Sequence, residues 1–189
     1  KVRILWARGG YTPIFSFLKK FLRMLLNNKM PMPGNNPSRR NLFKKGYVSK
    51  IWLNIAILDL LIFFNLYIRL LNLLGFFVIC DRYIKDTEID FRRNFPNVFN
   101  SNSLLWKLLV FSSPTPDQCF LLYVSVKVSL VRSKIKGEPF PDTPDTLKFR
   151  LQSYLDESMF PSDKYYKINC QKSIDNIQED IKDKLKGVI

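Results

Sequence analysis

The stretch that decides the fold is GFFVICDRYIKDTEIDF, residues 75–91. Its five consecutive apolar residues, 76–80, predict a strand that is buried on both faces, as strands of parallel sheets are. Asp81, Arg82 and Tyr83 follow this strand directly. Because open α/β sheets bind ligands beyond the carboxyl ends of their strands, these three side chains are predicted to lie at a ligand-binding edge. The alternative is that Asp81 and Arg82 only pair with each other.

An acid and an arginine side by side suit the chemistry of phosphate groups. A carboxylate oxygen can join the coordination shell of Mg²⁺, and a guanidinium can hold phosphoryl oxygens through a pair of hydrogen bonds. The chain contains no histidine, which excludes a Ser-His-Asp triad and histidine metal sites. Cys80, Cys119 and Cys170 form no C-x-x-C motif and are predicted to be buried thiols of a cytoplasmic protein.

The rest of the chain alternates strand-like and helical patterns. Its 189 residues, 47% of them apolar, fit one domain with a sizeable core, which we expect to span residues 1–189. Strands are predicted at 1–6, 76–80, 119–124 and 165–170. Helices are predicted at 13–26, 48–74, 84–95, 103–111, 126–135, 143–158 and 173–186. This alternation indicates βαβ units, and therefore an α/β fold with a parallel sheet.

The net charge of +14 is concentrated in the first third of the chain. Residues 1–58 hold 12 Lys and Arg and no acid, and residues 27–46 are a predicted basic loop. A polyanionic partner accounts for such a charge, and so does a solvated surface that keeps the protein soluble. Residues 48–74 are apolar enough for a membrane helix. Asp59 and Arg69 interrupt them, so we predict a core helix and no membrane span.

Several segments, in this order, resemble thymidylate kinases. They are the helix and strand at 58–83, the strand with its leading Pro-Asp at 116–122, the helix ending in Arg132, the helix at 147–154 with Arg150 and Tyr154 four apart, and residues 165–181. More narrowly, WARGGYTP (6–13), DRYIKDTEIDF (81–91) and KGEPFPDTPDTLKFRLQSY (136–154) resemble thymidylate kinase-like P-loop proteins of uncertain substrate. The resemblance covers nearly the whole chain.

The resemblance implies a three-layer nucleoside monophosphate kinase fold with a parallel sheet. It implies transfer of the γ-phosphoryl group of ATP to a nucleoside monophosphate such as dTMP, assisted by Mg²⁺, through positioning and charge neutralisation. Asp81 would hold Mg²⁺, Arg82 the transferring phosphate, and Arg132 would complete the catalytic set. The implied acceptor site comprises Arg8, Gly9, Gly10, Tyr83 and Asp86, and the implied lid at 133–143 carries Lys134 and Lys136. The implied partners are ATP and the nucleoside monophosphate, a homodimer is left open, and nucleic acid is not expected.

The sequence departs from the family pattern at three places. It contains no G-x-x-x-x-G-K-[ST] motif, the loop that cradles the phosphates of ATP. We expect that loop upstream of Lys1, and we expect these residues alone to be inactive. Arg8 stands where the family has proline, and Trp6 stands where the family has arginine. Asp59-Leu60 stands in place of an Asp-Arg pair that holds the acceptor, which leaves the acceptor open.

The missing loop also affects the predicted sheet. In the strand order that the resemblance implies, an absent first strand would lie between 76–80 and 119–124, and the sheet would show a cleft there. The phosphotransfer interpretation requires the flanking segments to form one parallel sheet. Two other functions stay open, a non-catalytic kinase-like binding or regulatory module and a basic protein that binds nucleic acid through residues 1–50.

Overall fold

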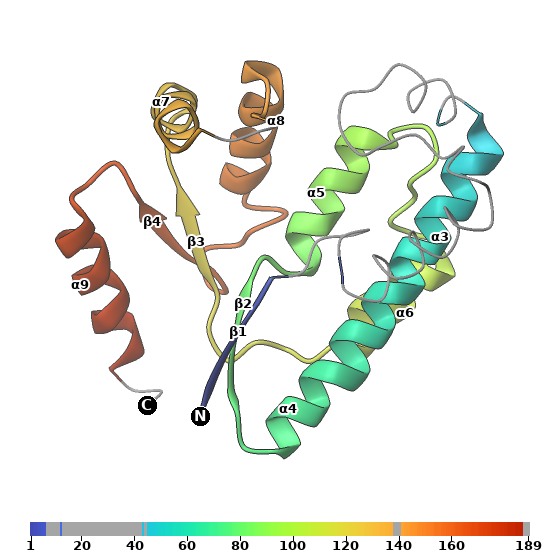
Figure 1. The fold of residues 1–189 in the computed structure, drawn as a ribbon, viewed down its shortest axis with the longest axis horizontal. Helices are drawn as coiled ribbons and strands as arrows, with labels where there is room; N and C mark the ends of the chain where they lie inside the picture. The colour runs from blue at the N-terminus through green and yellow to red at the C-terminus, as the bar shows by residue number, and fades with distance from the viewer. Residues whose placement is uncertain (7–11, 13–42, 44, 138–140, 187–189) are drawn as a thin grey trace. The chain divides into compact units, whose positions relative to one another are not determined.

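The computed structural model describes residues 1–6, 12, 43, 45–137 and 141–186, and the chain divides into two compact units, Lys1–Pro114 and Thr115–Ile189 (Figure 1). We call them unit 1 and unit 2. The predicted helix at 13–26 and nearly all of the predicted basic loop at 27–46 lie outside the described residues. The single domain over 1–189 stays a prediction.

Unit 1 contains a strand pair and a long helical rod, visible in Figure 1 as α3 running into α4. Its elements are β1 (Val2–Trp6), α3 (Gly46–Ile62), the π-helix η1 (Phe63–Ile68), α4 (Arg69–Leu73), β2 (Phe77–Asp81), α5 (Ile84–Asn94) and α6 (Leu104–Ser112). We call α3, η1 and α4 together the long helix. It matches the helix predicted at 48–74, although its central π-helical turns were not predicted.

One face of the long helix forms the core of unit 1. Apolar residues recur there at helical spacing, so that they share one face. They are Leu53, Ala56, Ile57, Leu60, Phe63, Phe64 and Ile68, all buried. Residues Ile84 and Phe91 of α5 and Trp106 and Leu109 of α6 complete the cluster. The π-helical turns are followed by Arg69, whose Nη2 donates a hydrogen bond to the carbonyl of Ser112 at 2.8 Å and so ties α6 to the long helix.

The long helix ends at a glycine that reverses the chain into β2. Gly75 has φ +73°, a left-handed conformation that lacks a steric cost only for glycine. Its N–H donates to the carbonyl of Asn72, and the N–H of Phe76 donates to that of Leu71, both at 3.0 Å. These bonds satisfy carbonyls at the helix end, and β2 starts two residues later.

The strands β1 and β2 pair in parallel, in register from Val2 opposite Phe77 to Trp6 opposite Asp81. Leu5, Val78 and Cys80 pack against the core on one face of the pair. The other face carries large apolar side chains that are 44–73% exposed, namely Val2, Ile4, Trp6, Phe77 and Ile79. The prediction that residues 76–80 are buried on both faces is therefore wrong. An uninterrupted apolar run shows that both faces of a strand are apolar. Whether a face is buried depends on another element of the fold that packs against it.

Unit 2 repeats the arrangement with its own strand pair. Its elements are β3 (Phe120–Tyr123), α7 (Val126–Lys136), α8 (Pro144–Leu155), β4 (Tyr166–Asn169) and α9 (Ile174–Leu185). The strands β3 and β4 are parallel, in register from Phe120 opposite Tyr166 to Tyr123 opposite Asn169. Each helix starts at a hydroxyl that accepts a backbone N–H, which satisfies a free donor of the first turn. The capping residues are Ser125, Thr143 and Ser173.

The α/β class with parallel strands is confirmed, but the single predicted sheet is not what the described residues form. They form two separate two-stranded sheets, β1–β2 and β3–β4. In the strand order that the resemblance implies, β1 is next to β2 and β3 is next to β4, and these are the two pairs observed. No described strand supplies hydrogen-bond partners to the remaining edge of β2 or β3, so the one-sheet arrangement that the kinase interpretation requires is not shown. The absent first strand stays a prediction.

The long helix is also the candidate for a membrane span. Residues Gly46–Leu73 have a mean hydropathy of 2.0 over their most apolar window, and 44% of that window is buried inside the protein. The buried face of this helix includes Asp59, which accepts a hydrogen bond from the hydroxyl of Thr12. The burial of Asp59 and its hydrogen bond with Thr12 support the predicted core helix.

Of the three cysteines that were predicted to be buried, Cys170 is buried, whereas Cys119 and Cys80 on β2 are only partly buried. Loss of solvent contact raises the pKa of the Cys80 thiol from 9.0 to about 11. A raised pKa means that the folded state holds the proton more tightly, so its contribution to stability is complete below pH 9 and is lost as the pH rises to about 11. We expect the difference in unfolding free energy between the wild type and Cys80→Val to change across that pH window. Urea titrations at several pH values measure it, and a constant difference would contradict this assignment.

Candidate functional site

The connection between β2 and α5 is short and conformationally unusual. Asp81 ends the strand, Ile84 begins the helix, and Arg82 between them has φ +75°. Among the residues that the structure describes, Arg82 alone has a positive φ without being glycine. The left-handed conformation costs a residue with a Cβ atom about 1–2 kcal/mol. Such strain is found preferentially at functional sites, where the surrounding structure imposes it.

Tyr83 anchors the connection to the body of unit 1. Its ring lies 4.6 Å from the ring of Phe64 in the core, measured between centroids. Its hydroxyl donates a 2.5 Å hydrogen bond to the carbonyl of Pro114. The residue that follows Arg82 is thus anchored to the core of unit 1 by a ring contact and a hydrogen bond.

Asp86 has a structural role in the first turn of α5. Its Oδ2 accepts the backbone N–H of Tyr83 at 3.4 Å, and its Oδ1 lies 3.7 Å from Nη1 of Arg82. The structure therefore pairs Arg82 with Asp86, whereas the sequence alternative paired it with Asp81. At 3.7 Å the contact with Asp86 is an ion pair longer than a hydrogen bond. The guanidinium of Arg82 has five N–H donors, so donors that the contact with Asp86 does not use can bind a ligand.

Asp81 stands at the edge where both strands of unit 1 end. It is exposed, and its partner across the pair is Trp6, the last residue of β1. Arg8, Gly9 and Gly10, the other predicted residues of this edge, lie outside the described residues. The structure thus brings together Asp81, Arg82, Tyr83 and Asp86 of the predicted site.

Arg132, which was predicted to complete the catalytic set, and the two lysines of the predicted lid lie on α7 of unit 2. Arg132 donates from Nη2 to the carbonyl of Cys170 at 2.8 Å, which ties α7 to the end of β4. Lys134 and Lys136 are exposed on the last turn of the helix. Residues 133–136 of the predicted lid are helical, Gly137 ends the helix at φ 63°, and residues 138–140 lie outside the described residues.

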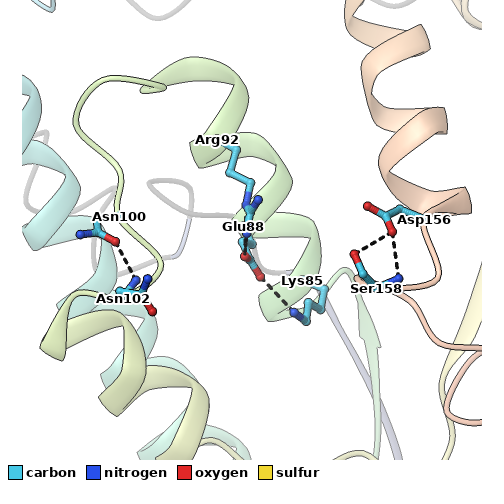
Figure 2. Close-up of polar contacts among 7 residues, drawn as sticks. All are labelled: Lys85, Glu88, Arg92, Asn100, Asn102, Asp156 and Ser158. Carbon is cyan, nitrogen blue, oxygen red and sulfur yellow. Dashed lines mark hydrogen bonds and ion pairs between the residues drawn. The ribbon is translucent and has the colours of Figure 1, made fainter.

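Figure 2 shows an acid on α5 that the sequence reasoning missed. The side chain of Glu88 is only 5% exposed. Its Oε2 pairs with Nζ of Lys85 at 3.1 Å, and its Oε1 pairs with Nη2 of Arg92 at 2.7 Å. The spacing of three and four residues could have indicated these pairs. Because two cations already neutralise it, Glu88 stabilises the helix and is not suited to act as a base. The other bonds in Figure 2, Asn100 to Asn102 and Asp156 to Ser158, shape turns.

The pairing of Thr12 with Asp59 is a second contact that the sequence could not reveal. The two residues lie 47 positions apart, and both are buried. The sequence analysis noted Asp59 for its place in the family pattern and as a charge that interrupts the apolar residues 48–74. Inside the core of unit 1, its carboxylate joins the chain beyond β1 to the long helix, which no local spacing indicates.

Magnesium is the metal that the resemblance implies, and Asp81 is its candidate ligand. No cluster of three or more Cys, Asp or Glu side chains occurs among residues 1–6, 45–137 and 141–186. Protein sites for Mg²⁺ often use only one or two carboxylates, with water and substrate phosphates as the other ligands. An exposed carboxylate at a strand end therefore fits such a shared site.

A hollow of about 330 Å³ lies between β4 and α9 of unit 2 and contains none of the predicted site residues. Lys167, Asp180, Asp183 and Lys184 are among its lining residues. Lys167 pairs with Glu157 at 2.6 Å, and this hydrogen bond is the main cause that lowers the pKa of Glu157 to about 2. Asp180 and Asp183 pair with lysines too, at 2.8 and 2.7 Å. The fourth charged residue, Lys184, lies over the ring of Tyr166 at 5.3 Å from its centroid, so each charge of the hollow already has a partner within unit 2.

The described residues thus define an α/β protein with an acid and a strained arginine at a strand end. No known protein family matches this chain, and no curated protein does. Among solved structures, the chain is similar to a deoxyadenosine kinase from M. mycoides with bound dCTP. The two chains are 14% identical, 98% of each is covered, and the TM-score is 0.49.

Proposed function

We propose that the edge formed by Asp81 and Arg82 binds the phosphate groups of a nucleotide, and that the protein belongs to the ATP-dependent phosphotransferases acting on a nucleoside monophosphate such as dTMP. The observation that carries this proposal is the conformation of Arg82. Glycine would meet the demand for φ +75° without steric cost. An arginine at this position is explained by what its side chain binds, and a guanidinium matches phosphate through paired hydrogen bonds.

The positions of the two side chains suit phosphate binding. The side chain of Arg82 is 30% exposed, so it can reach a ligand while part of its stem stays packed. The strand end precedes the N-terminus of α5, an 11-residue helix whose dipole favours negative charge there. Arg82 would neutralise the phosphate oxygens, and Asp81 would hold Mg²⁺, which supplies charge neutralisation when bound.

A second candidate function is nucleotide binding without catalysis. It requires the same phosphate-binding edge, but it does not require the backbone cradle and the lysine that a G-x-x-x-x-G-K-[ST] loop supplies for the triphosphate. Both functions need the site at Asp81 and Arg82. They differ only in turnover, which a radiolabel transfer assay from ATP to each common nucleoside monophosphate measures.

Nucleotide binding itself is tested by calorimetry with ATP and dTMP, with and without Mg²⁺. We expect Asp81→Asn to weaken binding of ATP in the presence of Mg²⁺ by about tenfold or more, since a charge-assisted contact is worth about 1.5–3 kcal/mol. Without Mg²⁺ the variant is expected to bind no more weakly than the wild type, because a carboxylate beside phosphate is repulsive without the metal. Asp163→Asn, an exposed acid in unit 2, is the control and should change neither value. Absence of binding to every nucleotide tested would refute the proposal.

A further inference from the structure

Two other elements of unit 1 hold the end of α6, at residues 112–114, which we call the exit segment. Asn65 donates from Nδ2 to the hydroxyl of Ser112 at 2.9 Å, and Arg69 donates from Nη2 to the carbonyl of Ser112 at 2.8 Å. From the turn before α5, the hydroxyl of Tyr83 donates to the carbonyl of Pro114 at 2.5 Å. The exit segment therefore joins the long helix to the residue that follows Arg82.

The end of α6 explains why a cation is useful at position 69 of an otherwise apolar helix. The last carbonyls of a helix carry partial negative charge. Within α6, all of which the structure describes, the last turn has no basic residue of its own, so Arg69 supplies the cation from the long helix. Asn65 lies in the π-helical turns of η1, and Arg69 directly follows them. Such turns are rare and appear frequently at functional sites.

The exit segment has few conformational alternatives, so a constraint on its first residue reaches its last. Ser113 precedes a proline, which restricts it to extended conformations, and it has φ −71° and ψ 144°. Its hydroxyl donates to the carbonyl of Leu109 at 2.6 Å. The ring of Pro114 fixes the φ angle of that residue. The chain between the carbonyls of Ser112 and Pro114 is therefore nearly rigid.

We propose that Arg69 is a positioning residue for Arg82, the arginine of the phosphate-binding edge; this inference rests on the function proposed for that edge. With Ser112 fixed by the long helix, the carbonyl of Pro114 stays within hydrogen-bond distance of Tyr83. Tyr83 follows Arg82 directly in the chain, so its anchor restricts the backbone that has to hold φ +75°. Arg69 thus acts on nucleotide binding without touching the nucleotide.

The test compares the ATP affinity of the wild type and Arg69→Met, measured by calorimetry in the presence of Mg²⁺. The variant keeps an unbranched stem and loses the donor, so we expect its affinity to fall about two- to tenfold, the equivalent of one hydrogen bond. Arg69→Lys keeps the charge and a donor and should recover part of the loss. Lys107→Met removes a positive charge from an exposed position of α6 and should leave affinity unchanged. Equal losses for the two methionine variants would show an effect of net charge alone and overturn the proposal.

Double variants separate positioning from a general loss of stability. In the Arg82→Gly background the guanidinium to be positioned is gone, so Arg69→Met should cause no further loss of ATP affinity. Tyr83→Phe keeps the ring contact with Phe64 and removes the hydroxyl, and it should behave as Arg69→Met does in both backgrounds. A further loss in the glycine background would show that Arg69 only stabilises unit 1, which would overturn the proposal.

Backbone NMR signals give a readout that needs no nucleotide. Arg69→Met should shift the amide signals of Arg82 and Asp86, whereas Lys107→Met should not. Nucleotide binding that Arg69→Met leaves unchanged would refute positioning while the proposed function stands. A wild type that binds no nucleotide would refute the proposed function. In that case unchanged amide signals at Arg82 would refute positioning too, and shifted signals would support it.

Discussion

Replacing Phe64 by alanine is expected to lower the free energy of unfolding by about 3–5 kcal/mol. Phe64 is fully buried at the centre of the core of unit 1, against Phe63 at 5.6 Å and Tyr83 at 4.6 Å between ring centroids. Removing its ring takes apolar surface out of the core and leaves a cavity that the packed helices cannot close. Total stabilities are about 5–15 kcal/mol, so a large part of the stability would be lost.

Phe111→Ala is the matched control for this prediction. Phe111 is the same residue type in the same unit, on α6, and is 90% exposed. Its replacement should change the free energy of unfolding by no more than about 0.5 kcal/mol. The three tryptophans Trp6, Trp52 and Trp106 all lie in unit 1, so urea titration followed by tryptophan fluorescence reports on this unit. Equal losses for the two variants would show that the core has been assigned incorrectly.

Phe64→Ala should weaken nucleotide binding as well as lower the free energy of unfolding. Tyr83 packs against Phe64 and holds the backbone next to Arg82. Without that support the left-handed conformation at Arg82 is no longer imposed, and Arg82 is expected to relax. Phe64→Ala should therefore weaken ATP binding even under conditions in which the variant is still folded, whereas Phe111→Ala should not. Calorimetry on both variants at low temperature measures this coupling.

Local patterns in the sequence predicted the secondary structure well and the pairing of distant segments less well. Helical spacing predicted the long helix, and the hydroxyls of Ser125 and Ser173 marked the starts of α7 and α9, because a capping residue acts on its own turn. The two strand pairs join the neighbours that the implied order requires. The covering of β2 on its second face was predicted wrongly, because that property depends on residues far away in the chain.

The site shows the same division between local and distant information. Asp81, Arg82 and Tyr83 were predicted from their position after an apolar strand, and the structure places them at its carboxyl end. The left-handed conformation of Arg82 could not be predicted, because nothing in its immediate sequence marks it. The partner of Arg82 was also missed, since the turn directs its guanidinium to Asp86 on the following helix. Position in a sheet is thus predictable from a strand pattern, but side-chain direction depends on the turn.

The second large effect is expected at Arg82, where stability and binding should respond differently. Arg82→Gly removes the steric cost of φ +75°, about 1–2 kcal/mol. It adds the backbone entropy of glycine, about 0.5–1 kcal/mol, and removes a partly exposed ion pair with Asp86, worth about 0–1 kcal/mol. These contributions nearly cancel, so we expect the free energy of unfolding to change by less than about 1 kcal/mol. Any loss of ligand binding then arises from the missing guanidinium.

Nucleotide affinity of Arg82→Gly should fall by about ten- to a hundredfold, because a charge-assisted bond to phosphate is lost. Arg82→Lys keeps the charge but not the paired donors, so its affinity should lie between that of the wild type and that of the glycine variant. Calorimetry with ATP and dTMP measures affinity, and urea titration measures stability in the same buffer. Arg82→Gly that bound nucleotide like the wild type would show that this arginine only connects β2 to α5. A stable variant that has lost binding would instead show that the strained backbone presents the guanidinium to phosphate.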